Sequence, residues 1–419
     1  MDCLEIEGGR KLCGQVRIQG SKNAVLPILS AALLNPGTTV LHDCPEIADV
    51  TAMGELLKGF GCQVKWEGNS LWIRAGIVKA GTGAAPGAEN MRASVLLLGS
   101  LLARTGEAYL PYPGGCVIGK RPVDLHLLAL RQLGAEIQEE EQGLRARCER
   151  PRGARIRLFY PSVGATENVL LLAVAAEGET VLENAAREPE IRELCRFLRA
   201  QGAEISGEGS PRIVIKGKDS GKKQFQDTEF RVMPDRIVAG TYLFLAAAVG
   251  GEVVLKNAPM EQLEAVEKVL DSMGVSREKS GREGEMRIRS PGRPRGGLFV
   301  RTEPYPGFPT DLQSPLLAAL SRAEGESLVE ETVFEARFGA VRELQKMGAR
   351  IEACGSRVRI CGGSLRGTEL EASELRGGAA LCIAAAAAEG KSRIRGKHYI
   401  DRGYENIIRD LQALGVVIH

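Results

Sequence analysis

Six stretches of this chain are almost entirely apolar and rich in alanine and leucine. Each has the length of a helix, reaches a glycine and continues into a short segment typical of a strand. A helix that is apolar on all sides is buried, so the pattern predicts six internal helices, each followed by a strand. The stretches are residues 29–43, 98–110, 171–184, 244–257, 317–331 and 383–396.

A second pattern repeats with the same period. Six times a helix end runs into a glycine and then a short strand, and these glycines lie roughly 70 residues apart. Each repeat therefore contains strands and two helices, one of them nearly all apolar. The six glycines are Gly61, Gly134, Gly202, Gly274, Gly348 and Gly415.

Six repeats in 419 residues predict an α/β protein with two similar domains of three repeats each. The alanine-rich helices are expected inside and the sheets around them, which gives a two-domain inside-out α/β barrel. We expect the chain to cross between the domains near residues 20 and 231. Residues 21–231 then form the N-terminal domain, and residues 1–20 join residues 232–419 in the C-terminal domain.

Composition narrows the function classes. The net charge of +2 does not require a nucleic acid or a membrane surface as partner, and the N-terminus shows no secretory signal. The ten cysteines form no CxxC pair, and the four histidines show no metal-ligand spacing, so no metal site is expected. A cytoplasmic protein fits these features best.

The stretch "PGGCVIGKRPVDLH" places Cys116 after two glycines and shortly before Lys120 and Arg121. Adjacent cations lower the pKa of a thiol, and such a group can act as a nucleophile or as a proton donor near neutral pH. A cysteine that merely packs in the core is the alternative, but the Pro-Gly-Gly setting argues against burial.

Two cations stand at the starts of apolar helices. Lys22 in "GSKN" and Arg92 in "MRAS" would add positive charge to helix N-termini, which bind anions through free N–H groups. A capped helix with solvated cations is the alternative for each of them.

Three further charged residues are candidates for the site, and each also has a purely structural explanation. Asp311 in "FPTD" precedes another helix, where it is either a helix-capping group or an ionised base. For Arg376 and Arg402, spacing alone favours surface positions.

Taken together, these stretches resemble the UDP-N-acetylglucosamine enolpyruvyl transferase family. The matching pieces occur in the family's order over essentially the whole chain, and the cysteine loop is the most specific of them. The family's two-domain inside-out barrel of six units agrees with the repeats. The pieces are "GSKNAVLPIL", "MRAS", "PGGCVIGKRPVDLH", "SVGATEN", "ENAAREPEI", "PDRI", "FPTDLQ", "ETVFEARF" and "YIDRGYE".

The resemblance implies transfer of the enolpyruvyl group from phosphoenolpyruvate to the 3-hydroxyl of UDP-N-acetylglucosamine, with release of phosphate, in peptidoglycan synthesis. It implies no cofactor and no metal, and it implies sensitivity to fosfomycin. Asp311 would accept the hydroxyl proton, and Cys116 would protonate the methylene carbon or form a covalent adduct. The residues implied for phosphoenolpyruvate are Lys22, Asn23, Arg121, Arg376 and Arg402, with Lys22 and Arg402 also placed among the catalytic residues.

The same resemblance implies the sugar-nucleotide site. Its residues would be Asn23, Arg92, Arg121, Pro122, Val123, Asp124, Leu125, Tyr160, Pro161, Ser162, Val163, Asp311 and Val333.

The sequence departs from the family's pattern at Glu374, Ala336 and Val238, where Asp, Asn and Glu are usual. A paralogue of low or no activity that still binds UDP-N-acetylglucosamine is therefore an alternative. The sister transferase that acts on shikimate 3-phosphate and an RNA-processing protein are two further alternatives. The oligomeric state is left open.

Overall fold

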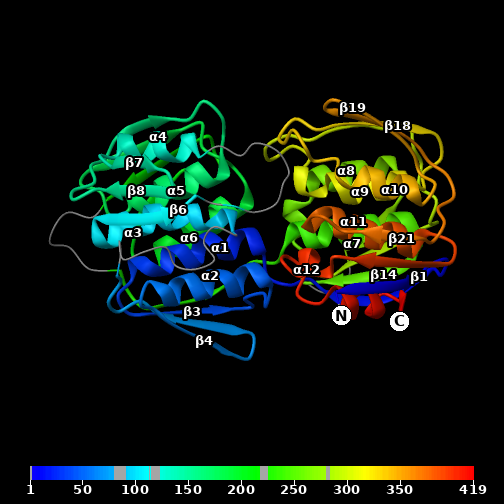
Figure 1. The fold of residues 1–419 in the computed structure, drawn as a ribbon, viewed down its shortest axis with the longest axis horizontal. Helices are drawn as coiled ribbons and strands as arrows, with labels where there is room; N and C mark the ends of the chain where they lie inside the picture. Colours follow the sequence, from blue (N-terminus) through cyan, green and yellow to red (C-terminus); the bar gives the residue numbers. More distant parts are fainter. Residues whose placement is uncertain (1, 80–90, 113, 115–122, 218–224, 280–283) are drawn as a thin grey trace. The chain divides into compact units, whose positions relative to one another are not determined.

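The computed structural model describes residues 2–79, 91–112, 114, 123–217, 225–279 and 284–419. Internal contacts divide these residues into two compact units (Figure 1). The C-terminal unit joins the residues up to Gln19 to Pro234–His419, and the N-terminal unit contains the described residues from Gly20 to Met233.

The C-terminal unit contains three four-stranded sheets among its described residues, and all three have the same plan. Two parallel strands lie side by side, and an antiparallel pair continues the sheet beyond the second of them. Strand β1 from the start of the chain completes the last sheet by pairing with β22 and β23. The sheets are β2 (Leu12–Arg17), β14 (Gly251–Lys256), β16 (Met286–Ser290) and β15 (Ser276–Lys279); β17 (Phe299–Arg301), β18 (Glu326–Glu330), β20 (Arg357–Cys361) and β19 (Arg350–Cys354); and β21 (Glu369–Glu371), β22 (Lys391–Arg395), β1 (Cys3–Glu7) and β23 (Val417–Ile418).

The N-terminal unit repeats this plan. Two of its sheets have four strands with one parallel pair each, and the third has three strands within the described residues. The sheets are β13 (Thr228–Arg231), β3 (Thr38–His42), β5 (Ser70–Arg74) and β4 (Gln63–Glu67); β9 (Arg155–Arg157), β10 (Glu179–Glu183), β12 (Arg212–Lys216) and β11 (Glu204–Ser206); and β6 (Glu107–Pro111), β8 (Gly143–Arg147) and β7 (Glu136–Glu140).

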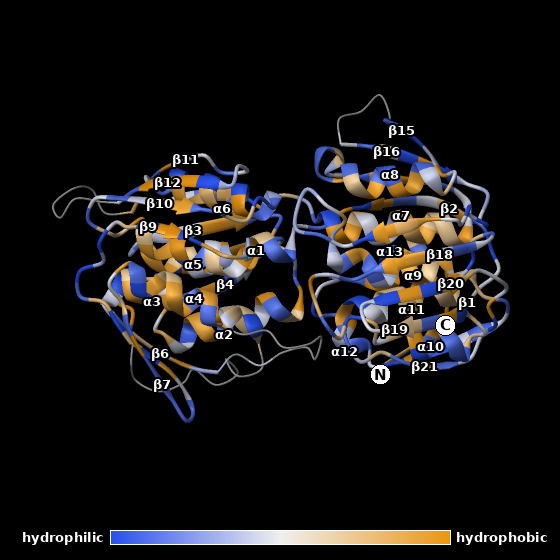
Figure 2. Cartoon of the chain, turned by 90° about the horizontal axis from the view of Figure 1, so that it is seen from above, coloured by the Kyte–Doolittle hydropathy of each residue, from blue (hydrophilic) through white to orange (hydrophobic). Residues whose placement is uncertain are grey.

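The alanine- and leucine-rich stretches form the buried helices, as predicted. Every residue of α9 and α11 is buried, and the orange helices inside each unit in Figure 2 show the same apolar interior. Within each unit the three buried helices pack against one another, and the strands around them alternate buried and exposed residues. The helices are α1 (Lys22–Ala31), α3 (Leu97–Thr105) and α5 (Val163–Ala173), and α7 (Arg236–Val249), α9 (Gln313–Leu320) and α11 (Leu375–Ala387).

The second helix of each repeat has one buried and one exposed face. All six glycines that follow these helices have positive φ, which confirms their predicted helix-ending role. Of the six buried helices, only α3 and α7 end directly at a glycine, Gly106 and Gly250, both with positive φ. The prediction of a closing glycine is wrong for the other four: α5, α9 and α11 end at non-glycine residues, and α1 runs into the 3₁₀ helix η1 (Ala32–Leu34). The second helices are α2 (Ala48–Gly59), α4 (Asp124–Gln132), α6 (Pro189–Ala200), α8 (Glu264–Ser272), α10 (Ala340–Lys346) and α13 (Ile407–Ala413), and the short helix α12 (Lys397–Ile400) precedes α13.

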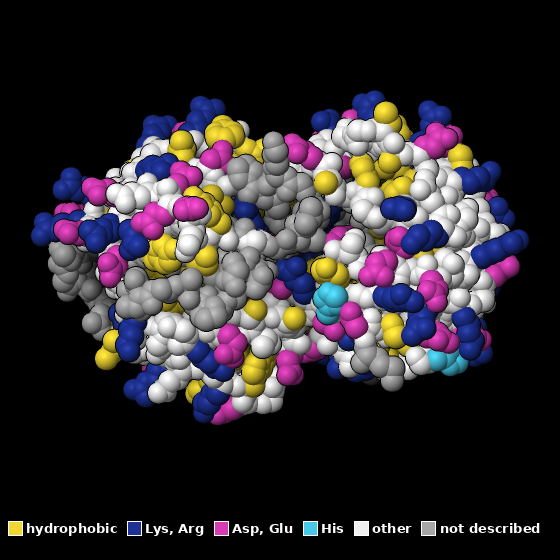
Figure 3. Space-filling view, in the orientation of Figure 1, with side chains coloured by type: hydrophobic (Ala, Val, Ile, Leu, Met, Phe, Trp, Pro, Cys, Tyr) yellow, Lys and Arg dark blue, Asp and Glu magenta, His cyan; other side chains and the backbone are white. Residues whose placement is uncertain are grey.

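The outer sheet faces of the C-terminal unit carry cross-strand ion pairs. Glu252 accepts hydrogen bonds from Arg287 and Arg289, and Glu330 accepts one from Arg357. Each exposed pair contributes little to stability. Positive and negative side chains are also mixed over the face of the molecule that Figure 3 shows.

None of the helices in the described part of the chain combines the length and apolar character that a membrane crossing requires. The same residues contain no group of His, Cys, Asp and Glu side chains suited to a metal ion.

Candidate functional site

The predicted site residues gather at the starts of the buried helices. In the N-terminal unit, Lys22 and Asn23 open α1, and Arg92 opens the 3₁₀ helix η3 (Arg92–Leu96) that leads into α3. In the C-terminal unit, Asp311 lies in the 3₁₀ helix η5 (Thr310–Leu312) that leads into α9, and Arg376 lies in the first turn of α11. Helix starts offer free N–H groups, so they suit charged groups and anionic ligands.

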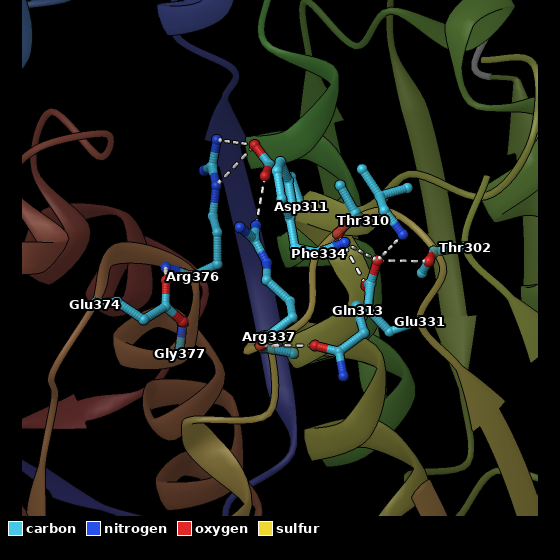
Figure 4. Close-up of polar contacts among 12 residues, drawn as sticks. Thr302, Thr310, Asp311, Gln313, Glu331, Phe334, Arg337, Glu374, Arg376 and Gly377 are labelled. Carbon is cyan, nitrogen blue, oxygen red and sulfur yellow. Dashed lines mark hydrogen bonds and ion pairs between the residues drawn. The ribbon is translucent and has the colours of Figure 1, made fainter. Parts of the chain in front are cut away.

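Asp311 is the centre of the site in the C-terminal unit. Its Oδ1 accepts a hydrogen bond from Nη2 of Arg337, and its Oδ2 accepts bonds from Nη2 and Nε of Arg376 at 3.0 and 3.3 Å (Figure 4). Both guanidinium groups are almost fully buried, whereas a quarter of the Asp311 side chain is exposed. Two fixed cations therefore orient one accessible carboxylate.

Arg376 is not the surface charge that its spacing favoured. It is 3% exposed, and the interpretation is wrong because the first turn of α11 lies against Asp311. Burial alone would lower the pKa of Arg376, but the charge of Asp311 and the nearby Tyr404 and Asp235 outweigh it and raise the pKa above its ordinary value. Arg376 is therefore a fixed positive charge.

Glu374 caps the helix that carries Arg376. Its carboxylate accepts hydrogen bonds from the backbone N–H groups of Arg376, at 2.8 Å, and of Gly377. A Cβ atom at Gly377 would lie 2.5 Å from Oε1 of Glu374. The glycine thus makes room for the long side chain of glutamate at this cap position.

The two other predicted residues of this unit lie in loops. Arg402 is half-buried in the turn after α12, and the ring of Tyr404, two residues on, lies 5.8 Å from the guanidinium of Arg376. Val333 is half-buried, and its N–H donates to Glu331.

In the N-terminal unit, Lys22 forms an ion pair with Asp49. The Nζ–Oδ2 distance is 2.7 Å, and the two side chains are 12% and 9% exposed, so Lys22 is not a solvated cation. Asp49 lies in the first turn of α2, and Ser21 caps α1 by accepting from the N–H of Ala24. The pair therefore fixes an ammonium group at a helix start, while Asn23 and Arg92 are half-buried.

The remaining predicted sugar-nucleotide residues of this unit surround the starts of α4 and α5. Val123 and Leu125 pack against the core of the unit, and Asp124 is the exposed first residue of α4. Tyr160 is exposed, Pro161 is half-buried, Ser162 caps α5 through the N–H of Ala165, and Val163 begins that helix.

His126 joins the starts of α4 and α5. Its Nδ1 lies 2.8 Å from the side-chain nitrogen of Asn168, and a Cβ atom at Gly164 would meet its ring at 2.6 Å. The close approach requires a glycine at position 164.

Cys116, Arg121 and Pro122 lie outside the described residues. Three residues that sequence reasoning did not select belong to the geometry above: Arg337, Asp49 and Glu331. Arg337 and Glu331 stand inside the motif "ETVFEARF", which was the available signal, whereas nothing in the sequence near Asp49 connected it to Lys22.

The side chains of Val238 and Ala336 carry no polar group, so neither forms a side-chain hydrogen bond at this site. Val238 is fully buried in the core of the C-terminal unit, where an apolar side chain suits the surroundings. Ala336 is exposed next to Arg337.

Comparison with known proteins places this arrangement in a family. The sequence model of EPSP synthase (3-phosphoshikimate 1-carboxyvinyltransferase) matches residues 6–411. Over its full length the chain is 44% identical to UDP-N-acetylglucosamine 1-carboxyvinyltransferase 2 of Caldanaerobacter subterraneus subsp. tengcongensis, and 45% identical to UDP-N-acetylglucosamine 1-carboxyvinyltransferase of Nitratidesulfovibrio vulgaris (strain DP4), covering 99% of each. The chain belongs to the UDP-N-acetylglucosamine 1-carboxyvinyltransferase family. The protein is thus a transferase.

Solved structures support the predicted fold of this transferase. The enolpyruvyl transferase NikO from Streptomyces tendae superimposes with a TM-score of 0.88 at 24% identity, covering 100% of this chain and 98% of that one. EPSP synthase from Acinetobacter baumannii gives a TM-score of 0.75 at 21% identity, with coverage of 100% and 99%. The transferase therefore has the enolpyruvyl transferase fold, as the repeats and the resemblance predicted.

Proposed function

We propose that this transferase moves the enolpyruvyl group of phosphoenolpyruvate to the 3-hydroxyl of UDP-N-acetylglucosamine and releases phosphate, the first committed step of peptidoglycan synthesis. The names of the full-length relatives support the acceptor. The observation that supports the reaction chemistry is the partly exposed carboxylate of Asp311, which forms ion pairs with the buried guanidinium groups of Arg337 and Arg376.

Asp311 would accept the proton of the acceptor hydroxyl as its oxygen attacks the central carbon of phosphoenolpyruvate. A base needs a fixed position within hydrogen-bond reach of the proton that it takes, and Arg337 and Arg376 supply that position. Cys116, whose role rests on the family resemblance, would donate a proton to the methylene carbon. Loss of phosphate and of one proton from that carbon then restores the double bond.

The cations are assigned to the anionic groups of the substrates. Lys22, Asn23, Arg121, Arg376 and Arg402 would bind phosphoenolpyruvate, whose phosphate and carboxylate need several fixed donors.

Arg376 is a buried, fixed positive charge at the start of α11, which supports its assignment to an anionic group of phosphoenolpyruvate. The sugar nucleotide would contact a second group of residues. These are Arg92, Arg121–Leu125, Tyr160–Val163 and Val333. The cysteines of the described part are all free thiols, which supports the expected cytoplasmic location.

The test is phosphate release from phosphoenolpyruvate with each of two acceptors. We expect turnover with UDP-N-acetylglucosamine and none with shikimate 3-phosphate, the acceptor in the name of the matching family model. Turnover with shikimate 3-phosphate alone would reassign the acceptor. Binding of UDP-N-acetylglucosamine by calorimetry without turnover would instead support a non-catalytic paralogue.

A matched variant tests the chemistry at Asp311. Asp311→Asn keeps the shape of the side chain, and loss of a general base typically costs about 10²–10⁴-fold in kcat. We expect a loss of that size with KM values close to those of the parent protein. An increase in KM with unchanged kcat would show that Asp311 only positions the acceptor.

A further inference from the structure

We propose that Glu331 is a positioning residue: its carboxylate fixes the positions of Asp311 and Val333. The inference rests on the proposed role of Asp311 as base. Glu331 is 2% exposed and directly follows β18, while Thr302 directly follows β17. Because β17 and β18 are parallel, these residues lie at the same sheet edge, beyond the carboxyl ends of the strands where α/β proteins place their sites.

The carboxylate of Glu331 receives four hydrogen bonds from three segments. Its Oε1 accepts from the hydroxyl of Thr302 at 2.8 Å and from the backbone N–H groups of Val333 and Phe334 at 2.8 and 3.1 Å. Its Oε2 accepts from the hydroxyl of Thr310 at 2.9 Å (Figure 4). One buried carboxylate therefore joins the ends of two strands to the start of η5.

The hydrogen bonds to the two carboxylate oxygens of Glu331, here called the Oε1 arm and the Oε2 arm, both lead to Asp311. Thr310 directly precedes Asp311, so the Oε2 arm fixes the backbone from which the Asp311 side chain projects. The Oε1 arm fixes Phe334, whose ring lies 5.5 Å from the guanidinium of Arg337, and Arg337 in turn donates to Asp311. Loss of the carboxylate would free the base and one of its two cations together.

The Oε1 arm also holds Val333, one of the residues proposed to contact the sugar nucleotide. The N–H of Val333 donates to Oε1 of Glu331. Thr332 donates two hydrogen bonds to Thr302, from its N–H to the hydroxyl at 3.0 Å and from its own hydroxyl to the carbonyl oxygen at 2.6 Å. The contact with Val333 would thus affect the KM for UDP-N-acetylglucosamine, whereas the contacts that lead to Asp311 would affect kcat. A misplacement of about 1 Å can cost about 100-fold in rate, so the effect on kcat is measurable.

The experiment compares Glu331→Ala with Glu331→Gln. The alanine variant removes every contact, and we expect kcat to fall about 10- to 100-fold. The glutamine variant keeps an oxygen for the three Oε1 donors and places an amide beside Thr310, whose hydroxyl can turn to accept it. We expect it to retain kcat within about threefold.

The neighbouring Glu330→Gln is the matched control. Glu330 pairs with Arg357 and Arg301 on the outer face of the sheet, so its variant should behave as the parent protein does. Equal kcat values for Glu331→Ala and Glu330→Gln would overturn the proposal.

A double variant separates positioning from a purely structural role. If Glu331 acts through Asp311, adding Glu331→Ala to Asp311→Asn should change the residual kcat by less than about threefold, since coupled residues are not additive. Two fully multiplied losses would overturn the proposal. If Glu331→Ala does not fold, Thr310→Val, which removes only the Oε2 arm, takes its place in the same cycle with the same criterion.

Crystal structures of the two Glu331 variants provide a readout that does not depend on the reaction. We expect the Asp311–Arg337 contact to persist in Glu331→Gln and to be lost in Glu331→Ala. Its persistence in both variants would overturn the positioning role. An inactive parent protein would by contrast count against the proposed function and leave this structural comparison valid.

Discussion

The two units use the same repeat but place different chemistry at the starts of their buried helices. In the N-terminal unit, Ser21 and Ser162 cap α1 and α5 with hydroxyl groups, and Lys22 and Arg92 add positive charge. In the C-terminal unit the caps of α7 and α11 are the carboxylates of Asp235 and Glu374, and Asp311 precedes α9.

This difference separates two tasks. Hydroxyl caps leave a helix start net positive, which suits the binding of phosphate and carboxylate groups. Carboxylates paired with buried guanidinium groups supply instead an oriented acceptor for a proton, as at Asp311. The comparison predicts that loss of the Lys22 cation mainly weakens substrate binding, whereas loss of the Asp311 carboxylate mainly slows the chemical step.

After Asp311→Asn, the largest effect that tests this comparison is expected at Lys22. Lys22→Gln would remove the proposed charge-assisted bond to phosphoenolpyruvate. Such a bond is worth about 1.5–3 kcal/mol, so the KM for phosphoenolpyruvate should rise about 10- to 150-fold while kcat falls less. Steady-state kinetics with varied phosphoenolpyruvate measure both constants. A loss confined to kcat would contradict the division of tasks.

Two controls accompany this variant. Removal of Lys22 takes away the cation that is paired with the nearly buried Asp49, which should lower stability. The double variant Lys22→Gln with Asp49→Asn should keep the KM effect and recover stability. Lys58→Gln removes an exposed cation paired with Glu55 and should leave both constants unchanged.

The sequence predicted the repeats and the interior because both depend on local patterns. Apolar stretches about one helix long identify α7 and α11, and glycines such as Gly61 and Gly415 mark helix ends through their backbone conformation alone. These signals need no knowledge of tertiary contacts. The family resemblance then supplied the candidate roles at Lys22 and Asp311.

The pairings within the site were not predictable in this way. Asp311 and Arg376 belong to different repeats, and the burial of Arg376 follows from the packing of α9 against α11 rather than from its neighbours in sequence. Lys22 and Asp49 likewise meet because the starts of two helices converge. Glu331 looks like one of several acidic residues after a strand until its four donors are known.

A smaller effect is expected from the cap of α11. Gly377→Ala places a Cβ atom against Oε1 of Glu374, so the carboxylate must leave the helix start and Arg376 loses its anchored turn. We expect kcat to fall about three- to tenfold with little loss of stability, because alanine also favours the helix by about 1 kcal/mol.

Restoring the shorter side chain tests the cause. The double variant Gly377→Ala with Glu374→Asp should recover most of the lost rate, since aspartate reaches the same amides without meeting the new methyl group. Gly54→Ala in α2 is the matched glycine substitution, because its Cβ atom would make only ordinary contact with Val64, and it should leave kcat unchanged. Two independent, additive losses in the double variant would contradict the coupling.

The smallest effect is expected on the free energy of unfolding, and it contrasts the carboxylates of Asp311 and Glu167. Asp311 has buried cations beside it, but Glu167 on α5 is buried near Glu188 and Glu190, and desolvation followed by these like charges raises its pKa well above the ordinary value of 4.5. The folded state therefore keeps the proton of Glu167 at pH values where the unfolded chain has lost it. As the pH rises above 4.5 toward the folded pKa, the unfolded state is progressively favoured.

Glu167→Gln removes this titration while keeping the size of the side chain. Relative to the parent protein, we expect little change in the free energy of unfolding near pH 5 and a gain of about 1 kcal/mol or more by pH 8. Both tryptophans, Trp66 and Trp72, lie in β4 and β5 of the N-terminal unit, so their fluorescence follows this unit during denaturant unfolding. The exposed Glu179→Gln is the control, and a stability difference for Glu167→Gln that does not grow with pH would show that the like charges around Glu167 do not limit this core.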